Sequence, residues 1–141
     1  MTYSDDKLPK GGNLVKDHLQ LFLKRLRARL EDANSNIKIR YFACGEYGEK
    51  FDRPHYHLII WGLGNKHRDF VEKSWTLGFV RIDEANNNRF AYVAGYVTKK
   101  KLARQTFSEK RLVPPFVTMS RNRGLGYHAI ARRARELRAR S

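Results

Sequence analysis

The sequence predicts an α+β fold in which helices pack against one central antiparallel sheet. Two neighbouring segments, 37–44 and 55–61, have strand character and are separated by a connection that contains two glycines and a proline. Three other segments carry apolar residues at helical spacing. Strands joined partly by a hairpin and partly by helices are typical of α+β proteins rather than of doubly wound parallel sheets. At 141 residues, the chain has the length of a single domain spanning 1–141.

The first helix is expected from Asn13 to about Glu31. Asn13 is a plausible N-cap, because an asparagine side chain can accept a hydrogen bond from a free backbone N–H at the start of a helix. The apolar positions of this segment fall on one stripe at helical spacing. They are Val15, Leu19, Phe22, Leu23, Leu26 and Leu30. This stripe is expected to pack on the sheet.

The next two segments are expected to form an antiparallel strand pair, 37–44 and 55–61, joined through 45–54. The first strand carries apolar groups on both faces and is therefore expected in the interior of the sheet. One face shows Ile37, Ile39, Tyr41 and Ala43, and the other shows Phe42 and Cys44. In the second strand, Tyr56, Leu58 and Ile60 share the face that a core can cover.

The rest of the chain alternates between helices and short strands. The expected elements are a helix at 66–75, a strand at 79–82, a helix at 88–101, a strand at 116–119, a glycine turn at 120–126 and a helix at 127–140. The last helix is expected to turn Ile130, Ala131, Ala134 and Leu137 inward. Trp61 and Trp75 are expected in the core or at its rim, and His18, His67 and His128 at the surface.

The charge of the chain suggests a polyanionic partner. Lys and Arg number 29 against 14 Asp and Glu, which gives a formal charge of +15. Basic surfaces gain affinity for a phosphate backbone through counterion release, whatever the base sequence. No apolar run approaches the roughly 20 residues needed to span a bilayer, and the N-terminus lacks a secretory pattern. The single cysteine, Cys44, excludes an internal disulfide and favours a reducing cytoplasm.

The most informative segment is Arg53-Pro54-His55-Tyr56-His57. Because strand side chains alternate between faces, His55 and His57 project side by side from one face. Neutral imidazole is a good ligand for divalent metals, so two parallel imidazoles provide half of a coordination sphere. The alternative interpretation is two surface histidines on a half-buried strand.

The helix expected at 88–101 carries a second candidate feature. Phe90, Val93, Ala94 and Val97 form its core stripe. Tyr92 and Tyr96 are four residues apart, so they lie on one face, and Lys99 extends that face by three more residues. These three side chains point away from the core stripe and are well placed to line a cleft. The alternative is that both tyrosines are ordinary surface aromatics.

Two imidazoles alone bind a metal weakly, so a third ligand is expected. Glu46 is the best candidate, because the hairpin brings the end of its strand alongside the start of the histidine strand. Glu49 and Asp52 fall on the turn itself, where charged groups are usually solvated. Two histidines and one carboxylate leave coordination positions open, as a catalytic metal site requires.

Several segments, in this order along the chain, resemble the replication-initiator proteins of microviruses, especially the gokushovirus branch. These proteins belong to the HUH endonucleases, which are named for a His-hydrophobic-His motif. The matching segments are Tyr41-Phe42-Ala43-Cys44-Gly45-Glu46-Tyr47-Gly48, 53–57, Tyr92-Val93-Ala94-Gly95-Tyr96-Val97-Thr98-Lys99-Lys100, the opening 2–9 and the late 119–126. In that family a strand precedes the opening Thr2-Tyr3 motif, so a central strand is expected to be cut short or absent here.

The resemblance implies an enzyme that nicks one strand of circular DNA to begin rolling-circle replication. It implies that His55, His57 and Glu46 hold Mg²⁺ or Mn²⁺, and that Tyr96, Tyr92 or both supply the nucleophile. The product would be a 5′-phosphotyrosine and a free 3′-OH. Tyr96 ranks first, because Lys99 stands one helical turn beyond it, whereas Gly95 occupies the equivalent place for Tyr92. The implied setting is the cytoplasm of a bacterial host, with viral origin DNA as substrate and host helicase and polymerase as further candidate partners.

Basic residues outside this centre are candidates for positioning single-stranded DNA through its phosphates. They are Arg53, Lys100, Arg121 and Arg123. The arginines of the last helix are equally well explained as a solvated tail. A non-catalytic DNA- or RNA-binding module is the main alternative function. A transposase of the same superfamily is a weaker one, since such enzymes typically carry one nucleophilic tyrosine.

Overall fold

A computed structural model describes residues 1–48, 52–99, 112–122 and 124–139, with side chains 96–99 excepted. Its centre is a five-stranded sheet with the strand order β4-β1-β3-β2-β5, and every pairing in it is antiparallel. The strands are β1 Thr2–Tyr3, β2 Arg40–Tyr47, β3 Pro54–Trp61, β4 Gly78–Phe79 and β5 Phe116–Met119. The α+β class and the antiparallel central sheet predicted from the sequence are confirmed.

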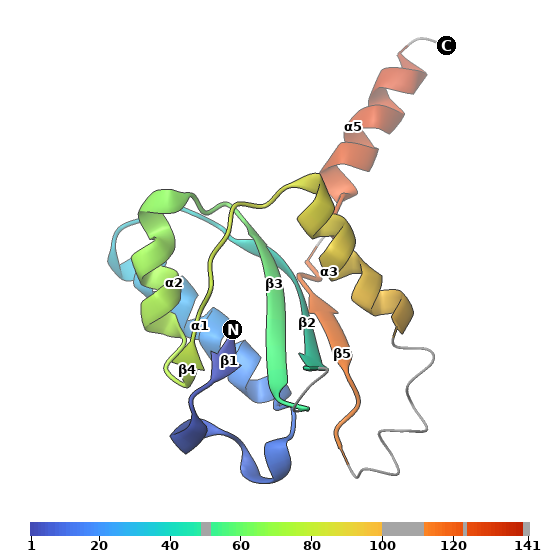
Figure 1. Ribbon diagram of the computed structural model, residues 1–141. Coiled ribbons are helices and arrows are strands. Elements are labelled where there is room, and N and C mark those ends of the chain that lie inside the picture. The colour runs from blue at the N-terminus through green and yellow to red at the C-terminus, as the bar shows by residue number, and fades with distance from the viewer. Residues whose placement is uncertain (49–51, 100–111, 123, 140–141) are drawn as a thin grey trace.

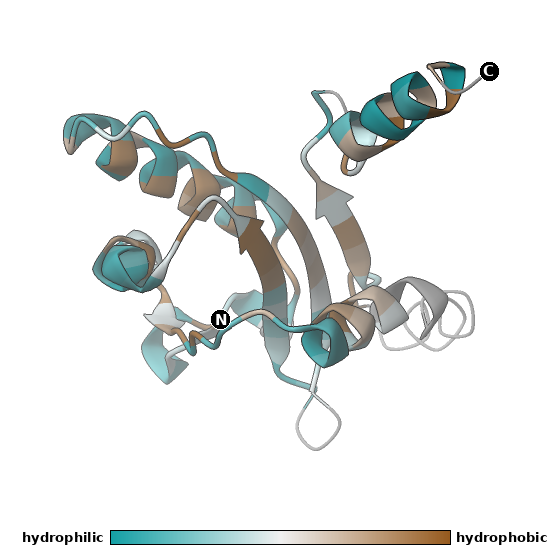
Figure 2. Ribbon diagram, turned by 90° about the horizontal axis from the view of Figure 1, so that it is seen from above, coloured by the Kyte–Doolittle hydropathy of each residue, from teal (hydrophilic) through white to brown (hydrophobic). Residues whose placement is uncertain are grey.

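Helices lie on both faces of this sheet. Helices α1 (Lys16–Asp32) and α2 (Arg68–Ser74) lie on one face, and α3 (Asn87–Lys99) lies on the other (Figures 1 and 2). Helix α5 (Tyr127–Arg138) projects away from the body (Figure 1). Short 3-10 turns occupy Asp5–Lys7, Lys10–Gly12 and Asn65–His67. None of the described helices is long and apolar enough to cross a membrane.

The stripe of α1 forms the main core with the inner face of the sheet. Its five buried residues, Leu19, Phe22, Leu23, Leu26 and Leu30, were all predicted from helical spacing. The predicted cap is wrong, because α1 begins at Lys16 and Asn13 accepts a hydrogen bond from the distant Val113 N–H at 2.8 Å. The N–H of Val15, which stands at the N-cap position, is bound by the Tyr56 hydroxyl instead.

Strands β2 and β3 separate two apolar clusters, as their alternation predicted. Ile39, Ala43 and Tyr56 belong to the large cluster under α1, whereas Cys44 and Ile59 belong to a small cluster under α3. Strand β2 lies between β3 and β5 and is therefore interior, although it begins at Arg40 rather than at 37. Strand β5 has the predicted bounds.

The opening Thr2–Tyr3 segment forms a two-residue strand between β3 and β4. Its register sets Thr2 opposite both His55 and Phe79. Strand β4 is shorter than the predicted 79–82, and it lies close against β1 because Gly78 has no side chain. A Cβ at Gly78 would collide with the backbone nitrogen of Ser4, and its φ of 153° is one that other residues rarely adopt.

Three predictions of burial are wrong. In α5, Ile130 is 70% exposed and Leu137 is also exposed, because no described element covers the apolar stripe of this helix. In α3, Ala94 is exposed although it falls on the predicted core stripe. His67 is buried rather than superficial, and its Nδ1 accepts the Gly64 N–H at 2.9 Å.

Candidate functional site

The β2–β3 hairpin places the predicted acidic and imidazole groups on one face of the sheet. Glu46 and His55 are direct partners across the two strands. Directly opposed residues share a face, and His57 lies two residues along β3 on that same face. The sequence-based expectation that Glu46 lies beside the histidine strand is therefore confirmed by the register.

Glu46 and His57 form the closest contact of the site. The Glu46 Oε1 lies 2.6 Å from the His57 Nε2, and both side chains are partly buried. A carboxylate can only accept in this contact, so Nε2 donates the hydrogen. This bond fixes the orientation of the His57 ring over the sheet.

His55 is oriented by the backbone of its own strand. Its Nδ1 lies 2.6 Å from the carbonyl oxygen of Arg53. Because a carbonyl only accepts, Nδ1 carries the hydrogen, and in the neutral ring Nε2 keeps its lone pair. The ring also lies against Gly48, where a Cβ would stand 3.0 Å from the ring carbon Cε1. A side chain at position 48 would therefore crowd the His55 imidazole.

Helix α3 crosses the same face and brings an aromatic ring to the histidines. Phe90 stacks on Trp61, with ring centroids 6.1 Å apart and planes 4° apart. Val93 packs against Ile59 in the small cluster. The Tyr92 ring meets the His57 ring edge-on at 5.8 Å, and its side chain is 58% exposed. Tyr92 is thus at the site, as the helical face of Tyr92, Tyr96 and Lys99 predicted.

The position of residue 96 follows from the direction of α3. Residues 90, 93 and 92 meet β3 at 61, 59 and 57, so α3 runs antiparallel to β3. Four residues of helix advance the backbone by about 6 Å, which carries residue 96 toward the His55 end of β3. The side chains of Tyr96 and Lys99, and the whole of Lys100 and Arg123, lie outside the described residues.

The donor set of Glu46, His55 and His57 has the chemistry that a divalent cation requires. An imidazole whose Nδ1 donates to a carbonyl, as in His55, is oriented in the manner of metal-ligating histidines. Within the described part of the chain, however, no three His, Cys, Asp or Glu side chains are grouped closely enough to hold a metal ion. The structure brings Glu46 and His57 together and leaves His55 turned toward Gly48.

Arg53 and Arg121 were predicted as DNA-binding residues. The Arg53 guanidinium contacts the first turn of the chain, with Nη1 2.8 Å from an Asp5 carboxylate oxygen and Nη2 donating to the Tyr3 carbonyl at 2.6 Å. It therefore ties β3 to β1. Arg121 is exposed after β5. A role in DNA binding stays a prediction for both arginines.

Cys44 is adjacent to the site but is chemically protected. It is buried opposite His57 in the β2–β3 register. Burial, and to a smaller extent the Glu46 carboxylate, raises the pKa of the Cys44 thiol to about 12. The thiolate needed for nucleophilic or metal chemistry is therefore scarce at neutral pH.

The sequence reasoning missed Thr2 and Phe79. Register places both in one transverse row with His55 and Glu46, on the same face of the sheet. A strand pattern at 79–82 was recognised, but nothing in the sequence shows which strand β4 pairs with. This pairing alone brings Phe79 into the row.

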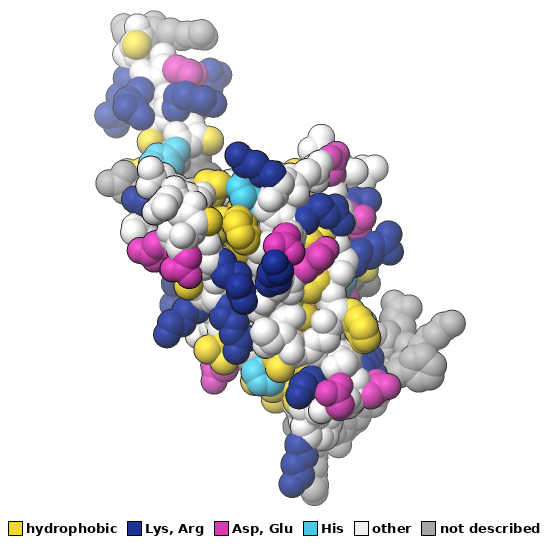
Figure 3. Space-filling model, turned by 90° about the vertical axis from the view of Figure 1, so that its left-hand side faces the viewer, with side chains coloured by type: hydrophobic (Ala, Val, Ile, Leu, Met, Phe, Trp, Pro, Cys, Tyr) yellow, Lys and Arg dark blue, Asp and Glu magenta, His cyan; other side chains and the backbone are white. Residues whose placement is uncertain are grey.

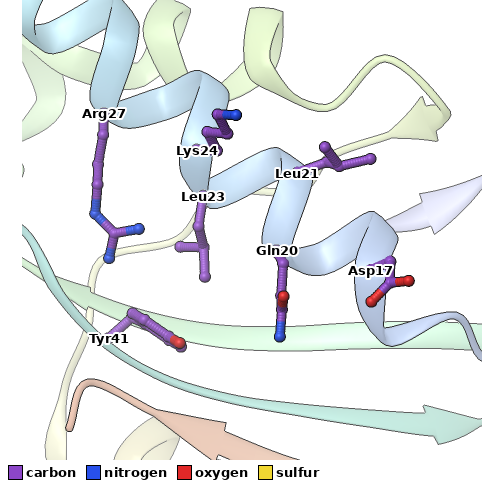
Figure 4. A pocket seen from close by; sticks show the side chains of 7 residues that line it. All are labelled: Asp17, Gln20, Leu21, Leu23, Lys24, Arg27 and Tyr41. Atoms are coloured by element: carbon purple, nitrogen blue, oxygen red, sulfur yellow. The ribbon is translucent and has the colours of Figure 1, made fainter.

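A cavity of about 580 Å³ lies on the opposite side of the sheet, between α1 and β2 (Figure 4). It is lined by Asp17, Gln20, Leu21, Leu23, Lys24, Arg27 and Tyr41. The Arg27 guanidinium stands 5.9 Å from the centroid of the Tyr41 ring. None of the site residues predicted from the sequence lines this cavity.

Fold and site together define a class of small, basic α+β proteins with a His-x-His strand and a tyrosine-bearing helix on one face of an antiparallel sheet. Comparison with known proteins places the chain within that class. It belongs to the family of replication-associated proteins that is named after ORF2, whose sequence profile matches residues 1–101. The microvirus resemblance found in the sequence is confirmed.

Three curated relatives carry related names. The chain is 38% identical over 120 residues to the replication-associated protein ORF4 of Chlamydia phage 1, an alignment that covers 71% of this chain and 29% of the relative. It is 33% identical to the replication-associated protein ORF2 of Spiroplasma virus 4, with 90% and 45% covered. It is 31% identical to the replication-associated protein VP4 of Bdellovibrio phage phiMH2K, with 71% and 37% covered. The chain thus spans less than half the length of each relative, and no solved structure matches it.

Proposed function

We propose that this protein is an HUH-type replication initiator, which nicks and rejoins single-stranded DNA through a tyrosine with the help of a divalent metal. The observation that carries the proposal is the arrangement on one face of the sheet. Glu46 and His57 are 2.6 Å apart, His55 lies on the same face, and Tyr92 of α3 meets His57 edge-on. The names of the relatives agree with a role in replication.

Glu46, His55 and His57 are the residues that would hold Mg²⁺ or Mn²⁺. When bound, the cation would neutralise charge on the scissile phosphate and orient it for in-line attack. Loading requires the Glu46–His57 hydrogen bond to be given up, since its carboxylate oxygen and ring nitrogen are both donor atoms for the metal. His55 already presents a lone pair at Nε2.

A tyrosine on α3 is the proposed nucleophile. Its phenolic oxygen forms a bond to phosphorus while the bond from phosphorus to the 3′ oxygen breaks. The phenolic proton is released and the 3′ oxygen gains one, which leaves a free 3′-OH and a 5′-phosphotyrosine. Because a phosphodiester is retained, the reverse reaction can join ends without ATP. Lys99, one helical turn beyond Tyr96, would steady the phosphate or the phenolate.

The proposed substrate is the single-stranded or supercoiled circular DNA of a phage, in the cytoplasm of a bacterial host. The net charge of +15 agrees with such a partner. Lys100, Arg121 and Arg123 are proposed to contact its phosphates, and Arg53 to do so while it braces β1. Host helicase and polymerase are the proposed successors at the freed 3′ end.

The proposal is tested by looking for a covalent adduct that resists denaturation. Purified protein is incubated with labelled circular single strands from a related phage in Mn²⁺, and the products are separated on a denaturing gel. We expect an adduct that chelator abolishes. Tyr96→Phe should remove it, and Tyr92→Phe should leave at least one round of nicking. Full adduct formation by both variants would refute the ranking of the tyrosines, and no adduct with the unaltered protein would refute the enzyme.

One observation favours a second function, a non-catalytic module that binds DNA or RNA. The three donor groups are not gathered around one point within the described residues. Such a module would bind single strands with the same salt dependence but form no covalent product under any metal condition. The adduct assay therefore separates the two functions directly.

A further inference from the structure

Phe79 is an aromatic side chain displayed to solvent beside the candidate site. It is 67% exposed, although it belongs to a strand of the central sheet. Its partner across the ladder is Thr2, whose partner on the other side is His55, which in turn faces Glu46. Since directly opposed residues share a face, the four side chains form one row on the face that α3 crosses.

The backbone under Phe79 is held firmly. Gly78 lies so close to β1 that a Cβ would collide with the Ser4 nitrogen. The Ser4 N–H donates to the Leu77 carbonyl at 2.9 Å, and the Trp75 indole N–H donates to the Thr2 carbonyl at 2.9 Å. The exposed ring therefore stands on a fixed support rather than on a loose loop. A fixed, solvent-facing aromatic ring loses little conformational freedom when a flat ligand stacks on it.

Phe79 also stands at a useful distance from the site. Two strand spacings of about 4.8 Å separate β4 from β3, so the row extends about 10 Å from His55 to Phe79. Helix α3 packs over β3 and β2, on the other side of His55 from β4. The half of the face that carries Thr2 and Phe79 continues outward from the donor groups along a single line.

The charges near this end of the row suit a polyanion. Arg81 follows Phe79 by two residues and is highly exposed. Arg81 and Arg89 share one carboxylate, that of Asp83, so this cluster carries a net positive charge. Seen from the side of α2 and β4, many Lys and Arg side chains lie among the exposed hydrophobic groups (Figure 3). A fixed aromatic ring beside basic groups is the usual combination for binding single-stranded nucleic acid.

We infer that Phe79 is a stacking platform for a nucleobase of single-stranded DNA, next to the phosphate at the Glu46, His55 and His57 site. The inference deepens the proposed function and rests on it for the identity of the ligand. Phe79 acts as a positioning residue, since it holds a flanking nucleotide and touches no reacting atom. Stacking on a ring reads no hydrogen-bonding edge, so the contact is independent of base identity.

The test is equilibrium binding of a fluorescein-labelled oligothymidylate of about 20 nucleotides, followed by fluorescence anisotropy without metal. Phe79→Ala should weaken binding by about 5-fold to 100-fold, the range expected for loss of one base–aromatic stack. Phe79→Trp should bind at least as tightly as the unaltered protein, and its added indole should be quenched by the DNA. Leu21→Ala, which removes an exposed apolar side chain from α1 on the other face, is the matched control and should change nothing.

Two further readouts distinguish stacking from damage to the fold. The slope of affinity against salt should be unchanged in Phe79→Ala, because no phosphate contact is lost. An abasic strand of the same length should bind the unaltered protein and Phe79→Ala equally. Equal affinities for oligothymidylate, or an equal loss on both strands, would overturn the inference. These measurements need no nicking, so they stand apart from the adduct assay: a protein can pass either test and fail the other.

Discussion

The two faces of the central sheet have opposite characters, although one strand supplies both. In β3, Tyr56 is fully buried against α1, whereas His55 and His57 on either side of it reach the partly open face. The inner face is an aromatic and aliphatic core that includes Tyr3, Tyr56, Phe22 and Trp75. The outer face has a smaller cluster, around Val93, and a row of polar groups.

This difference indicates a division of labour between stability and chemistry. The free energy of folding comes chiefly from apolar burial, and most buried apolar side chains lie on the inner face. The outer face can therefore carry imidazoles, a carboxylate and exposed phenol rings at a modest cost to the fold. Substitutions on the two faces should consequently affect different observables.

The largest expected effect on stability is that of Trp75→Ala. Trp75 is 3% exposed and packs on Tyr3, Tyr56 and Phe22 with ring centroids 5.4, 5.6 and 6.3 Å away. Truncation of a buried tryptophan costs about 3–5 kcal/mol, and the hydrogen bond to the Thr2 carbonyl is lost as well. The unfolding transition in urea should move accordingly.

The matched control for Trp75→Ala is Trp61→Ala on the outer face. Trp61 is 40% exposed and has Phe90 stacked against it. Its removal should cost about 1 kcal/mol, the worth of an aromatic pair with limited burial. Similar losses for the two tryptophans would mean that the outer face is as important for stability as the inner one.

A reversed pattern is expected for His57→Ala. Loss of this side chain should leave the free energy of unfolding within about 1 kcal/mol of the unaltered value, because the His57–Glu46 bond is partly exposed. Adduct formation should fall by about 10³-fold, or roughly 4 kcal/mol in the barrier. Titration with Mn²⁺, which should raise the melting temperature of the unaltered protein through binding, should have no such effect on the variant.

His128→Ala is the control for that experiment, since His128 lies on α5, away from the row. Both the Mn²⁺ effect on melting and the adduct should persist in this variant. A persistent Mn²⁺ effect in His57→Ala would show that the cation binds somewhere else. The proposed donor set would then be wrong even if nicking were observed.

Sequence patterns predicted what depends on local periodicity. The alternation in β2 and β3 gave the correct faces for Ala43, Cys44, Tyr56 and His57, because a pleated strand fixes side-chain direction residue by residue. The stripe of α1 was correct for the same reason. The hairpin between these strands was short enough to fix their register, which placed Glu46 beside the histidines.

The failures concern contacts made over long distances in the chain. An apolar stripe does not show whether another element covers it, so Ile130 of α5 was placed in a core that it does not reach. Asn13 is bound by Val113, a hundred residues away, and does not cap α1. Phe79 was missed because its place beside His55 depends on the pairing of β1 with β4.

A smaller loss of stability is expected for Tyr56→Phe. The buried Tyr56 hydroxyl accepts the Val15 N–H at 2.8 Å and donates to the Val15 carbonyl at 3.1 Å, and it lies 2.6 Å from the Tyr3 hydroxyl. The substitution leaves these groups without a partner at about 1–3 kcal/mol. Tyr92→Phe, on the outer face, should change stability by less than about 0.5 kcal/mol. Urea unfolding of the two variants compares one phenol on each face.

The smallest expected effect is a pH dependence that arises on the inner face at His18. Its Nδ1 lies 2.9 Å from the Tyr3 hydroxyl. Burial, assisted by Arg25 and opposed by Asp17, lowers the pKa of His18 below its usual value near 6.5. The unfolded chain then binds a proton more readily than the folded one, so stability is complete above about pH 6.5 and declines as the pH falls through the lowered pKa. His18→Gln keeps an acceptor for the Tyr3 hydroxyl but cannot titrate. Between about pH 7 and pH 5, its melting temperature should fall less than that of the unaltered protein, and identical profiles would show that His18 is solvated and that the inner face is less closed than its aromatic contacts indicate.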